Sequence, residues 1–381
     1  MHIHLGLLVV QPPLRNYLFA EGQEARRSTM PSFDSLQLPL PLIETPLPRE
    51  SGKLIASKSQ DVTIHQDGVT TVANMVLESL KKNEYSIKMW KQHDLHPKQM
   101  TKETVDWIFV VDTLNFSFWS ETNDKRFLVD YQGEMHSGYW ALCAAINRAL
   151  DEDIPITSAS YFSCMTMKQL RHIFRSSTDT DIPLLEKRLK HLHEAGKVLL
   201  EKFEGSFANC ISQCGQSASK LLQLVTENFP SYRDVATIDG APVSLYKRAQ
   251  ILIADIWACF EGQGFGNFTD IKVLTMFADY RVPQVLNYFG VLKYSANLRE
   301  ILESGRLFTP GERLEVEIRG CSIWAVELIH EELQRLMDEE GALSDLSLNS
   351  IIIDFYLWDY SKDHWQDMKH LPIHRIRSTF Y

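Results

Sequence analysis

The acidic residue Asp279 stands between a largely apolar run and a proline, a position from which a carboxylate could serve a pocket. Pro283 cannot continue a preceding helix, but it suits the first turn of a new one. The sequence therefore predicts one helix around Leu274, a second helix from Pro283 to a stop at Gly290, and Asp279 at the junction between them. There the free N–H groups and the dipole of the second helix favour a charged carboxylate.

Two aromatic residues, Phe277 and Tyr280, flank Asp279 and would form an apolar wall beside it. A charged acid held in such a pocket can stabilise positive charge that develops in a reaction. The alternative is that Asp279 only caps the second helix, which is a common role for an acid at this position.

The basic residue Lys247 lies in a second informative segment, residues 238–260. Asp239, Gly240 and Pro242 predict a tight hairpin at its start. A helix follows, and its main apolar face is formed by Leu245, Ala249, Leu252, Ile256 and Phe260. Lys247 is off this face but still has apolar neighbours, so we expect it to be buried. A buried lysine extends its amine to water, pairs with an acid or takes part in chemistry.

The order of these features along the chain is itself informative. Lys247 precedes Asp279 by thirty-two residues. A hairpin, a helix that carries a lysine and an acid at a later helix junction form the arrangement of the helix-hairpin-helix DNA glycosylases. The residues therefore suggest chemistry on a glycosidic bond.

Longer strings resemble one family throughout most of the chain. The chain is similar to the queuosine salvage protein family in DTLNFSFW (112–119), SGYWALCAAINRALDEDIPITSASY (137–161), EKFEGSF (201–207), YKRAQILIADIW (246–257), MFADYRVPQVL (276–286), EVEIRGCSIWAVE (315–327), DFYLWDY (354–360) and HRIRSTFY (374–381). The resemblance runs in order from about Thr45 to Tyr381 without a large gap.

This resemblance implies a mainly α-helical enzyme with a small β insertion and a helix-hairpin-helix, DNA-glycosylase-like architecture. It also implies hydrolysis of the N-glycosidic bond of queuosine 5′-monophosphate, which releases free queuine for salvage into tRNA modification. Asp279, in MFADYR, would be the catalytic acid, and Lys247, in YKRAQ, would lie in the same pocket. The implied partner is a small nucleotide, with no cofactor, no bound metal, no nucleic acid polymer and no membrane.

The role of Lys247 has two alternatives. Some DNA glycosylases form a Schiff base through a lysine amine. Hydrolysis alone requires no such adduct, so we expect Lys247 to be a charge partner or a contact to the ribose or phosphate.

Two further segments could bind the substrate. Asp354 and Trp358 are four residues apart and share one face of a helix, where the carboxylate could accept hydrogen bonds from a purine-like base while the indole stacks on it. The alternative is that Asp354 and Asp359 flank a core helix. Near the end of the chain, Arg375 or Arg377 could hold the 5′-phosphate, because a guanidinium matches the geometry of a phosphate.

Composition limits the function classes. The net charge of −10 disfavours a duplex or tRNA as ligand, because such binding requires many lysines and arginines. Two other classes stay open. A lesion-removing DNA glycosylase would bind duplex DNA in a salt-dependent manner, and a non-catalytic nucleoside-binding protein would take up ligand without turnover.

The six cysteines include no CxxC pair, and the thirteen histidines include no HExxH motif. We therefore expect a reducing, intracellular environment and no zinc site. We expect a cytoplasmic protein, with the nucleus as a second site and the mitochondrion as a weaker alternative that rests on Arg15, Arg26 and Arg27.

The chain divides into two parts of different character. Residues 1–47 predict a disordered or gene-model N-terminal extension, too short in its apolar run to span a membrane. Residues 48–381 predict the glycosylase domain, with a small β element at about 105–132 and a helix-hairpin-helix-like region at about 228–290.

Within the domain, residues 105–119 are rich in branched and aromatic side chains and predict a strand that pairs with residues 127–131. Gly133 predicts a turn, and Ser137 predicts the cap of the following helix. A long helix is predicted with a core face of Leu185, Leu189, Leu192, Leu199 and Phe203 and a solvated face of Lys187, Arg188 and Lys190.

Overall fold

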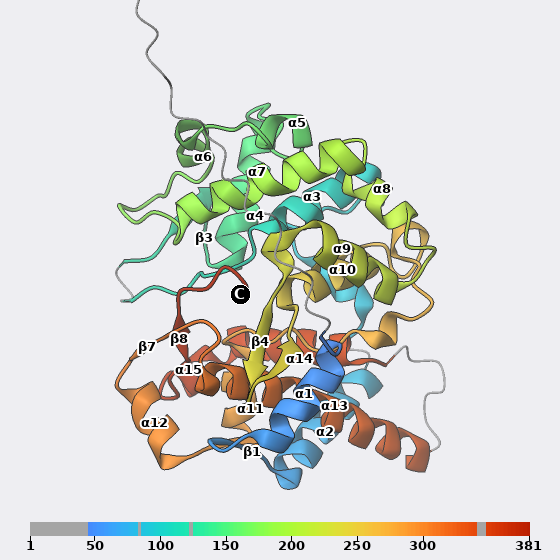
Figure 1. Cartoon of the computed structure of the whole chain (residues 1–381), viewed down its shortest axis with the longest axis vertical. Helices are drawn as coiled ribbons and strands as arrows, with labels where there is room; N and C mark the ends of the chain where they lie inside the picture. Colours follow the sequence, from blue (N-terminus) through green and yellow to red (C-terminus); the bar gives the residue numbers. More distant parts are fainter. Residues whose placement is uncertain (1–44, 83–84, 122–124, 341–347) are drawn as a thin grey trace, which may run out of the picture. The chain divides into compact units, whose positions relative to one another are not determined.

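The computed structural model describes residues 45–82, 85–121, 125–340 and 348–381, and this part of the chain is mainly helical, as predicted (Figure 1). The longer helices are α1 (Pro48–Lys58), α2 (Gln66–Lys81), α3 (Lys102–Thr113), α4 (Tyr139–Asp151), α6 (Met167–Ile173), α7 (Leu185–Lys202), α9 (Ala218–Asn228), α10 (Lys247–Cys259), α11 (Val282–Tyr288), α12 (Ala296–Glu303), α13 (Arg313–Glu340) and α14 (Ser350–Asp363). Short helices are α5 (Ala159–Phe162), α8 (Phe207–Ser212) and α15 (Trp365–Met368). No helix among the described residues has the length and apolar character needed to cross a membrane.

The strands form four two-stranded sheets within the described residues. Three are antiparallel and one is parallel: β1 (Val62–Ile64) with β6 (Leu292–Tyr294), β2 (Leu128–Tyr131) with β3 (Glu134–Ser137), β4 (Val235–Ile238) with β5 (Ala241–Ser244), and the parallel pair β7 (Leu307–Phe308) with β8 (Arg375–Ile376). These short pairs tie together loops between helices.

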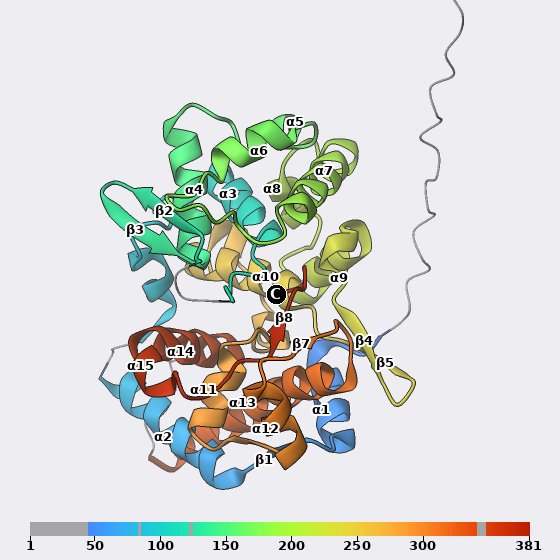
Figure 2. The same ribbon diagram turned by 90° about the vertical axis from the view of Figure 1, so that its left-hand side faces the viewer.

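Two groups of helices meet at α10 (Figure 2). One group contains α3 to α8, and the other contains α1, α2 and α11 to α15. Helix α10 packs on α3 and α9, and all its residues except Ile251 are buried. This central position explains why the helix is apolar on nearly every side. The hairpin β4–β5 immediately precedes it, as predicted from Asp239 and Gly240.

The prediction of a strand at 105–119 is wrong. Residues Lys102–Thr113 form helix α3, capped by the Thr101 hydroxyl, which accepts a hydrogen bond from the Thr104 N–H. Its branched and aromatic residues are buried from Val105 to Thr113 apart from Asp106, so they reflect a helix enclosed on most sides and not a sheet. Strand β2 therefore pairs with β3 across a turn at Gly133, and not with residues 105–119.

Two other local predictions are wrong. Ser137 lies in β3, and the residue that caps α4 is Gly138, with a φ of 62°. Arg188 on α7 is fully buried, whereas Lys187 and Lys190 are exposed as predicted. Its guanidinium donates to the backbone carbonyls of Leu114 and Phe116, which lie in irregular chain after α3 and have no helical partners.

The predicted helix around Leu274 is absent as well. Residues Leu274–Asp279 have no regular secondary structure, and the buried segment lies between a short 3₁₀ turn (Ile271–Val273) and α11. The second predicted helix does form at Val282–Tyr288, and Gly290 follows it with a φ of 70°. Asp279 therefore lies at the start of α11, after an extended segment and not after a helix.

The predicted extension at 1–47 falls almost wholly outside the described residues. Its last three residues, Thr45 to Leu47, are described, and two of them contact the hairpin region. The Thr45 hydroxyl is 3.1 Å from the hydroxyl of Tyr246, and the Pro46 carbonyl accepts a hydrogen bond from the Ser244 hydroxyl at 2.5 Å. These contacts bring the residues before α1 against the start of α10.

Close packing of α1 on α13 yields the first prediction. A Cβ atom on Gly320 would lie 2.4 to 2.6 Å from three atoms of Ile55, so Gly320→Ala forces the two helices apart. We expect a loss of about 1–3 kcal/mol in the free energy of unfolding, as for other overpacked cores. Urea unfolding measures this loss. Gly215→Ala would not serve as a control, because the positive φ of Gly215 makes that substitution strained. The control is Ser304→Ala, at an exposed position. Equal urea midpoints for Gly320→Ala and Ser304→Ala would contradict the packing argument.

Candidate active site

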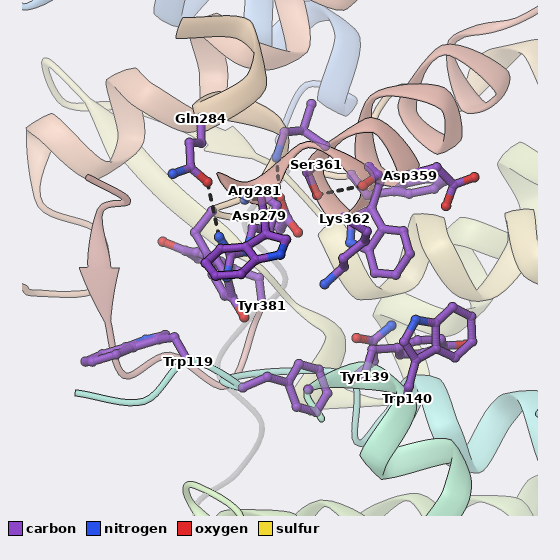
Figure 3. A pocket seen from close by; sticks show the side chains of 18 of the residues that line it. Trp119, Tyr139, Trp140, Asp279, Arg281, Gln284, Asp359, Ser361, Lys362 and Tyr381 are labelled. Atoms are coloured by element: carbon purple, nitrogen blue, oxygen red, sulfur yellow. Dashed lines mark hydrogen bonds between the residues drawn. The ribbon is translucent and has the colours of Figure 1, made fainter. Parts of the chain in front are cut away.

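A cavity of about 870 Å³ lies beside α10, α11 and α14, within the size range of pockets that enclose small ligands (Figure 3). Seven of the eight residues predicted for a substrate site or catalysis line it, and six of these are Lys247, Phe277, Asp279, Tyr280, Asp354 and Trp358. Arg375 also lines the cavity, whereas Arg377 does not. Residues from segments far apart in the chain therefore line the same cavity.

Asp279 is half-buried on the cavity wall. Its Oδ1 atom accepts hydrogen bonds from the backbone N–H groups of Arg281 at 2.7 Å and Val282 at 3.0 Å, where α11 begins. Asp279 therefore caps α11 and lines the cavity at the same time. The capping bonds use Oδ1 and leave Oδ2 free of them, so the cap fixes the direction in which the second oxygen points.

Lys247 is the first residue of α10 and is 5% exposed, in agreement with the prediction that it is buried. The turn before it requires Tyr246 in the left-handed region, with a φ of 46°. Burial lowers the pKa of the Lys247 amine, and the negative charges of Asp279, Asp112 and Asp354 oppose this effect. The amine therefore lies among carboxyl groups at the cavity wall.

One buried arginine, Arg319 on α13, connects the segments that carry the two candidates. Its Nε donates to the carbonyl of Ala278, next to Asp279, at 2.9 Å. Its Nη2 donates to Asp234 Oδ2 at 2.5 Å, and this same oxygen accepts the backbone N–H of Lys247 at 3.1 Å. Arg319 is 2% exposed, and its guanidinium also bonds to Glu315 and lies 4.1 Å from the Tyr381 ring centroid. We call Arg319 with Asp234 the arginine clamp.

Asp354 lies beside these groups on α14 and is 3% exposed. Its Oδ1 accepts the backbone N–H of Phe277 at 2.9 Å. Burial raises the pKa of the Asp354 carboxyl well above its usual range, and the nearby negative charge of Asp279 acts in the same direction. Asp354 is thus a carboxyl that retains a proton at higher pH than an ordinary aspartic acid, at a position open to the cavity.

Aromatic residues form much of the opposite wall, and sequence reasoning missed most of them. Tyr139 and Trp140 at the start of α4 face Lys362 across the cavity, with Trp119 further along (Figure 3). Trp140 stacks on His93 with ring centroids 3.3 Å apart and meets Trp358 edge-on at 5.9 Å. Such a wall offers flat surfaces on which a heteroaromatic ring can stack. Tyr139 and Trp140 stand in the string SGYW, but the sequence did not indicate where their side chains point.

The basic residues differ in how they meet the cavity. Arg377 donates to the Trp119 carbonyl at 2.8 Å, and its guanidinium lies 3.6 Å from the Trp119 ring centroid, so it holds this wall in place. Arg375 lines the cavity as part of β8. Two cations that sequence analysis did not consider, Arg281 and Lys362, also line it. No group of His, Cys, Asp and Glu suited to a metal ion occurs among the described residues.

Comparisons with known proteins agree with this geometry. Residues 95–381 match the family described as queuosine salvage protein. The chain belongs to the queuosine salvage protein family. It is 53% identical over 335 residues to the queuosine 5′-phosphate N-glycosylase/hydrolase of Bos taurus, which covers 88% of this chain and 98% of the relative. The protein of that name from Schizosaccharomyces pombe is 40% identical over 354 residues, covering 87% and 99% respectively.

The mouse relative, also a queuosine 5′-phosphate N-glycosylase/hydrolase, is 50% identical over 335 residues, covering 88% of this chain and 98% of its own length. Family membership therefore confirms the resemblance that was based on the quoted strings. The matched range 95–381 contains every cavity residue discussed above except His93, which precedes it.

The second prediction concerns the arginine clamp. Replacing Arg319 with Met leaves Asp234 and Glu315 buried without their counter-charge, so we expect a loss of about 3–5 kcal/mol in the free energy of unfolding. Chemical denaturation measures it, with exposed Arg299→Met as the matched control. Adding Asp234→Asn to Arg319→Met should restore part of the loss, because one uncompensated charge is removed. A double variant no more stable than the single variant would contradict the clamp.

Proposed function

We propose that this protein hydrolyses the N-glycosidic bond of queuosine 5′-phosphate and releases queuine, in the cavity beside Asp279. The observation that carries the proposal is the pair of Asp279 and Lys247 at one cavity wall, in a chain of the queuosine salvage protein family. The match to two relatives named for this activity extends over 98% and 99% of their own length. The aromatic wall suits a substrate with a flat base.

Asp279 is the proposed catalytic acid residue. Breaking the bond between ribose and base develops positive charge on the ribose, as in other glycoside cleavages, and a fixed carboxylate stabilises it. The two backbone N–H groups that hold Oδ1 pre-orient the side chain before substrate binds. The same carboxylate can accept a proton from the attacking water. The water oxygen then bonds to the ribose carbon as the bond to the base breaks.

Lys247 is the proposed charge partner in this site. Its amine has no hydrogen-bond or ion-pair partner among those of the described residues, although the charges of Asp279 and Asp354 act on it. A cation at this point fixes the position of the acidic groups and can contact the ribose oxygens of a substrate. The reaction needs water and not an enzyme amine, so the proposal includes no Schiff base.

Asp354, with Phe277, Tyr280 and Trp358 around it, is the proposed recognition site for the base. Queuine is a 7-deazaguanine, and its carbon at position 7 cannot take up a proton as the ring nitrogen of guanine can. The departing base therefore needs a proton or hydrogen bond at another atom. A protonated Asp354 carboxyl can donate it, because burial raises its pKa.

A mononucleotide suits this site better than a polymer. The net charge of −10 weakens any interaction with a polyphosphate, whereas one phosphate needs only a few cations at the cavity. The hairpin β4–β5 followed by α10 supports a helix-hairpin-helix-like unit at residues 228–290. Six free cysteines, five of them buried, support a reducing compartment, and we propose the cytoplasm.

The third prediction tests the function directly. Incubation of the purified protein with queuosine 5′-phosphate should yield free queuine, detected by mass spectrometry. Asp279→Asn should retain the fold but turn over at least about 10³-fold more slowly, since loss of charge stabilisation costs about 4 kcal/mol.

The exposed residue Asp179 lies outside the cavity wall and provides the control Asp179→Asn, which should leave turnover unchanged. Near-normal turnover by Asp279→Asn would show that this residue is a helix cap only. Tight binding of queuosine 5′-phosphate without product from the wild-type protein would favour the nucleoside-binding alternative.

The fourth prediction concerns pH. Since Asp354 acts in its protonated form, turnover should fall as the pH rises through its raised pKa, and Asp354→Asn should remove this decline along with about 10²–10⁴-fold in rate. The pH dependence of kcat for both proteins measures this. An Asp354→Asn variant that is slow but keeps the alkaline decline would assign the titrating group to another residue.

A further inference from the structure

Two cations face the cavity beside Asp279 without an anionic partner. Arg281 precedes α11, and Lys362 lies near the end of α14 (Figure 3). The ion pairs found among the described residues include neither side chain.

Arg281 is held in a fixed orientation. Its Nη1 donates to Gln284 Oε1 at 3.1 Å, and Gln284 Nε2 in turn donates to the carbonyls of Met368 and Leu371 at 3.3 and 2.6 Å. Gln284 is 8% exposed, so this arrangement is largely protected from water. One side of the guanidinium is thus anchored to the loop after α15, and its other donors remain for a ligand.

Lys362 lines the cavity, and its amine lies 4.4 Å from the Trp358 ring centroid. Loss of solvation lowers the pKa of this amine to about 8, and the positive charge of Arg281 lowers it further, against the opposing charges of Asp279 and Asp359. Two like charges that act on each other at an open cavity are relieved when an anion binds between them.

We propose that Arg281 and Lys362 form the subsite for the 5′-phosphate of the nucleotide. This inference rests on the proposed function, since it assigns a part of that substrate to two residues of the same cavity. Arg281 follows Asp279 by two residues, and Asp279, Arg281 and Lys362 line the same cavity, so the anion site is next to the acid that faces the ribose. A 5′-phosphate is attached to that same ribose.

The C-terminal arginines suit this role less well. Arg377 is bonded to the Trp119 carbonyl and is not a cavity residue. Arg375 lines the cavity, but its Nη1 atom lies against Gly305, 3.1 Å from where a Cβ on that glycine would stand, and Gly305 is not part of the cavity wall. The guanidinium of Arg375 therefore points toward the loop before β7.

The test compares two substrates, queuosine 5′-phosphate and queuosine. Arg281→Ala and Lys362→Ala should each lower kcat/KM for the nucleotide by about 10- to 150-fold, the worth of one charge-assisted hydrogen bond. They should leave kcat/KM for the nucleoside unchanged. Arg281→Ala retains the backbone N–H that donates to Asp279 Oδ1, so its effect reports the guanidinium alone. The exposed residues Arg299 and Lys187 give the matched controls Arg299→Ala and Lys187→Ala.

Equal losses on both substrates, or a selective loss in Arg375→Ala and not in these two variants, would overturn the assignment. A second measurement does not depend on catalysis. Ribose 5-phosphate should bind the wild-type protein in calorimetry, and either alanine substitution should weaken that binding by about 10-fold or more. Absence of binding to the wild type, or equal binding by the variants, would overturn the subsite, whereas binding without queuine release would overturn only the proposed function.

The pH dependence provides a third readout. A lysine is charged below its pKa, so above a pH of about 8 kcat/KM for the nucleotide should show a limb in addition to the Asp354 decline that both substrates share. This additional limb should be absent for the nucleoside. Lys362→Arg keeps its charge at these pH values and should abolish the limb. A limb of equal size for both substrates would contradict the role of Lys362.

Discussion

The hydrogen bonds of Arg319 are the interaction on which the rest of the site depends. This residue and Asp234 are both buried, and together they join the turn before α10 to the extended segment before α11. Removing an arginine and two carboxylates from water is costly unless their bonds are complete. Here the guanidinium bonds to Asp234, Glu315 and the Ala278 carbonyl, and the Tyr381 hydroxyl donates to Glu315 at 2.8 Å. The segments that carry Asp279 and Lys247 are therefore both held in place by Arg319 and Asp234.

The site also explains why an extended segment precedes α11. In the extended segment no helical hydrogen bond uses the Ala278 carbonyl, and this carbonyl accepts the Arg319 Nε instead. The extended backbone also exposes the Phe277 N–H, which binds Asp354. Its amide groups are satisfied by buried side chains from α13 and α14, and these bonds require the whole fold.

Sequence reasoning selected residues that line one cavity, but it did not predict the surroundings of these residues. The proline after Asp279 and the hairpin before Lys247 are local signals, and both elements formed as predicted. Residues 105–113 were assigned to a strand because branched and aromatic residues favour strands, yet burial on several sides of α3 accounts for the same composition. Arg188 was expected in water because its helical neighbours are charged. Its acceptors lie more than seventy residues earlier in the chain, where no local pattern could reveal them.

The distribution of charge in the cavity follows from these constraints. A protein with a net charge of −10 cannot attract a nucleotide by its general field, so selectivity for one must arise locally. Buried carboxyl groups around Lys247 create a polar centre suited to a developing positive charge, while Arg281 and Lys362 offer positive charge to one side of it. Gln284 orients Arg281 without neutralising its charge, so the positive charge of Arg281 stays available for an anion. An anion held at that side uses binding energy from a group that does not react, and this energy can hold the ribose against Asp279.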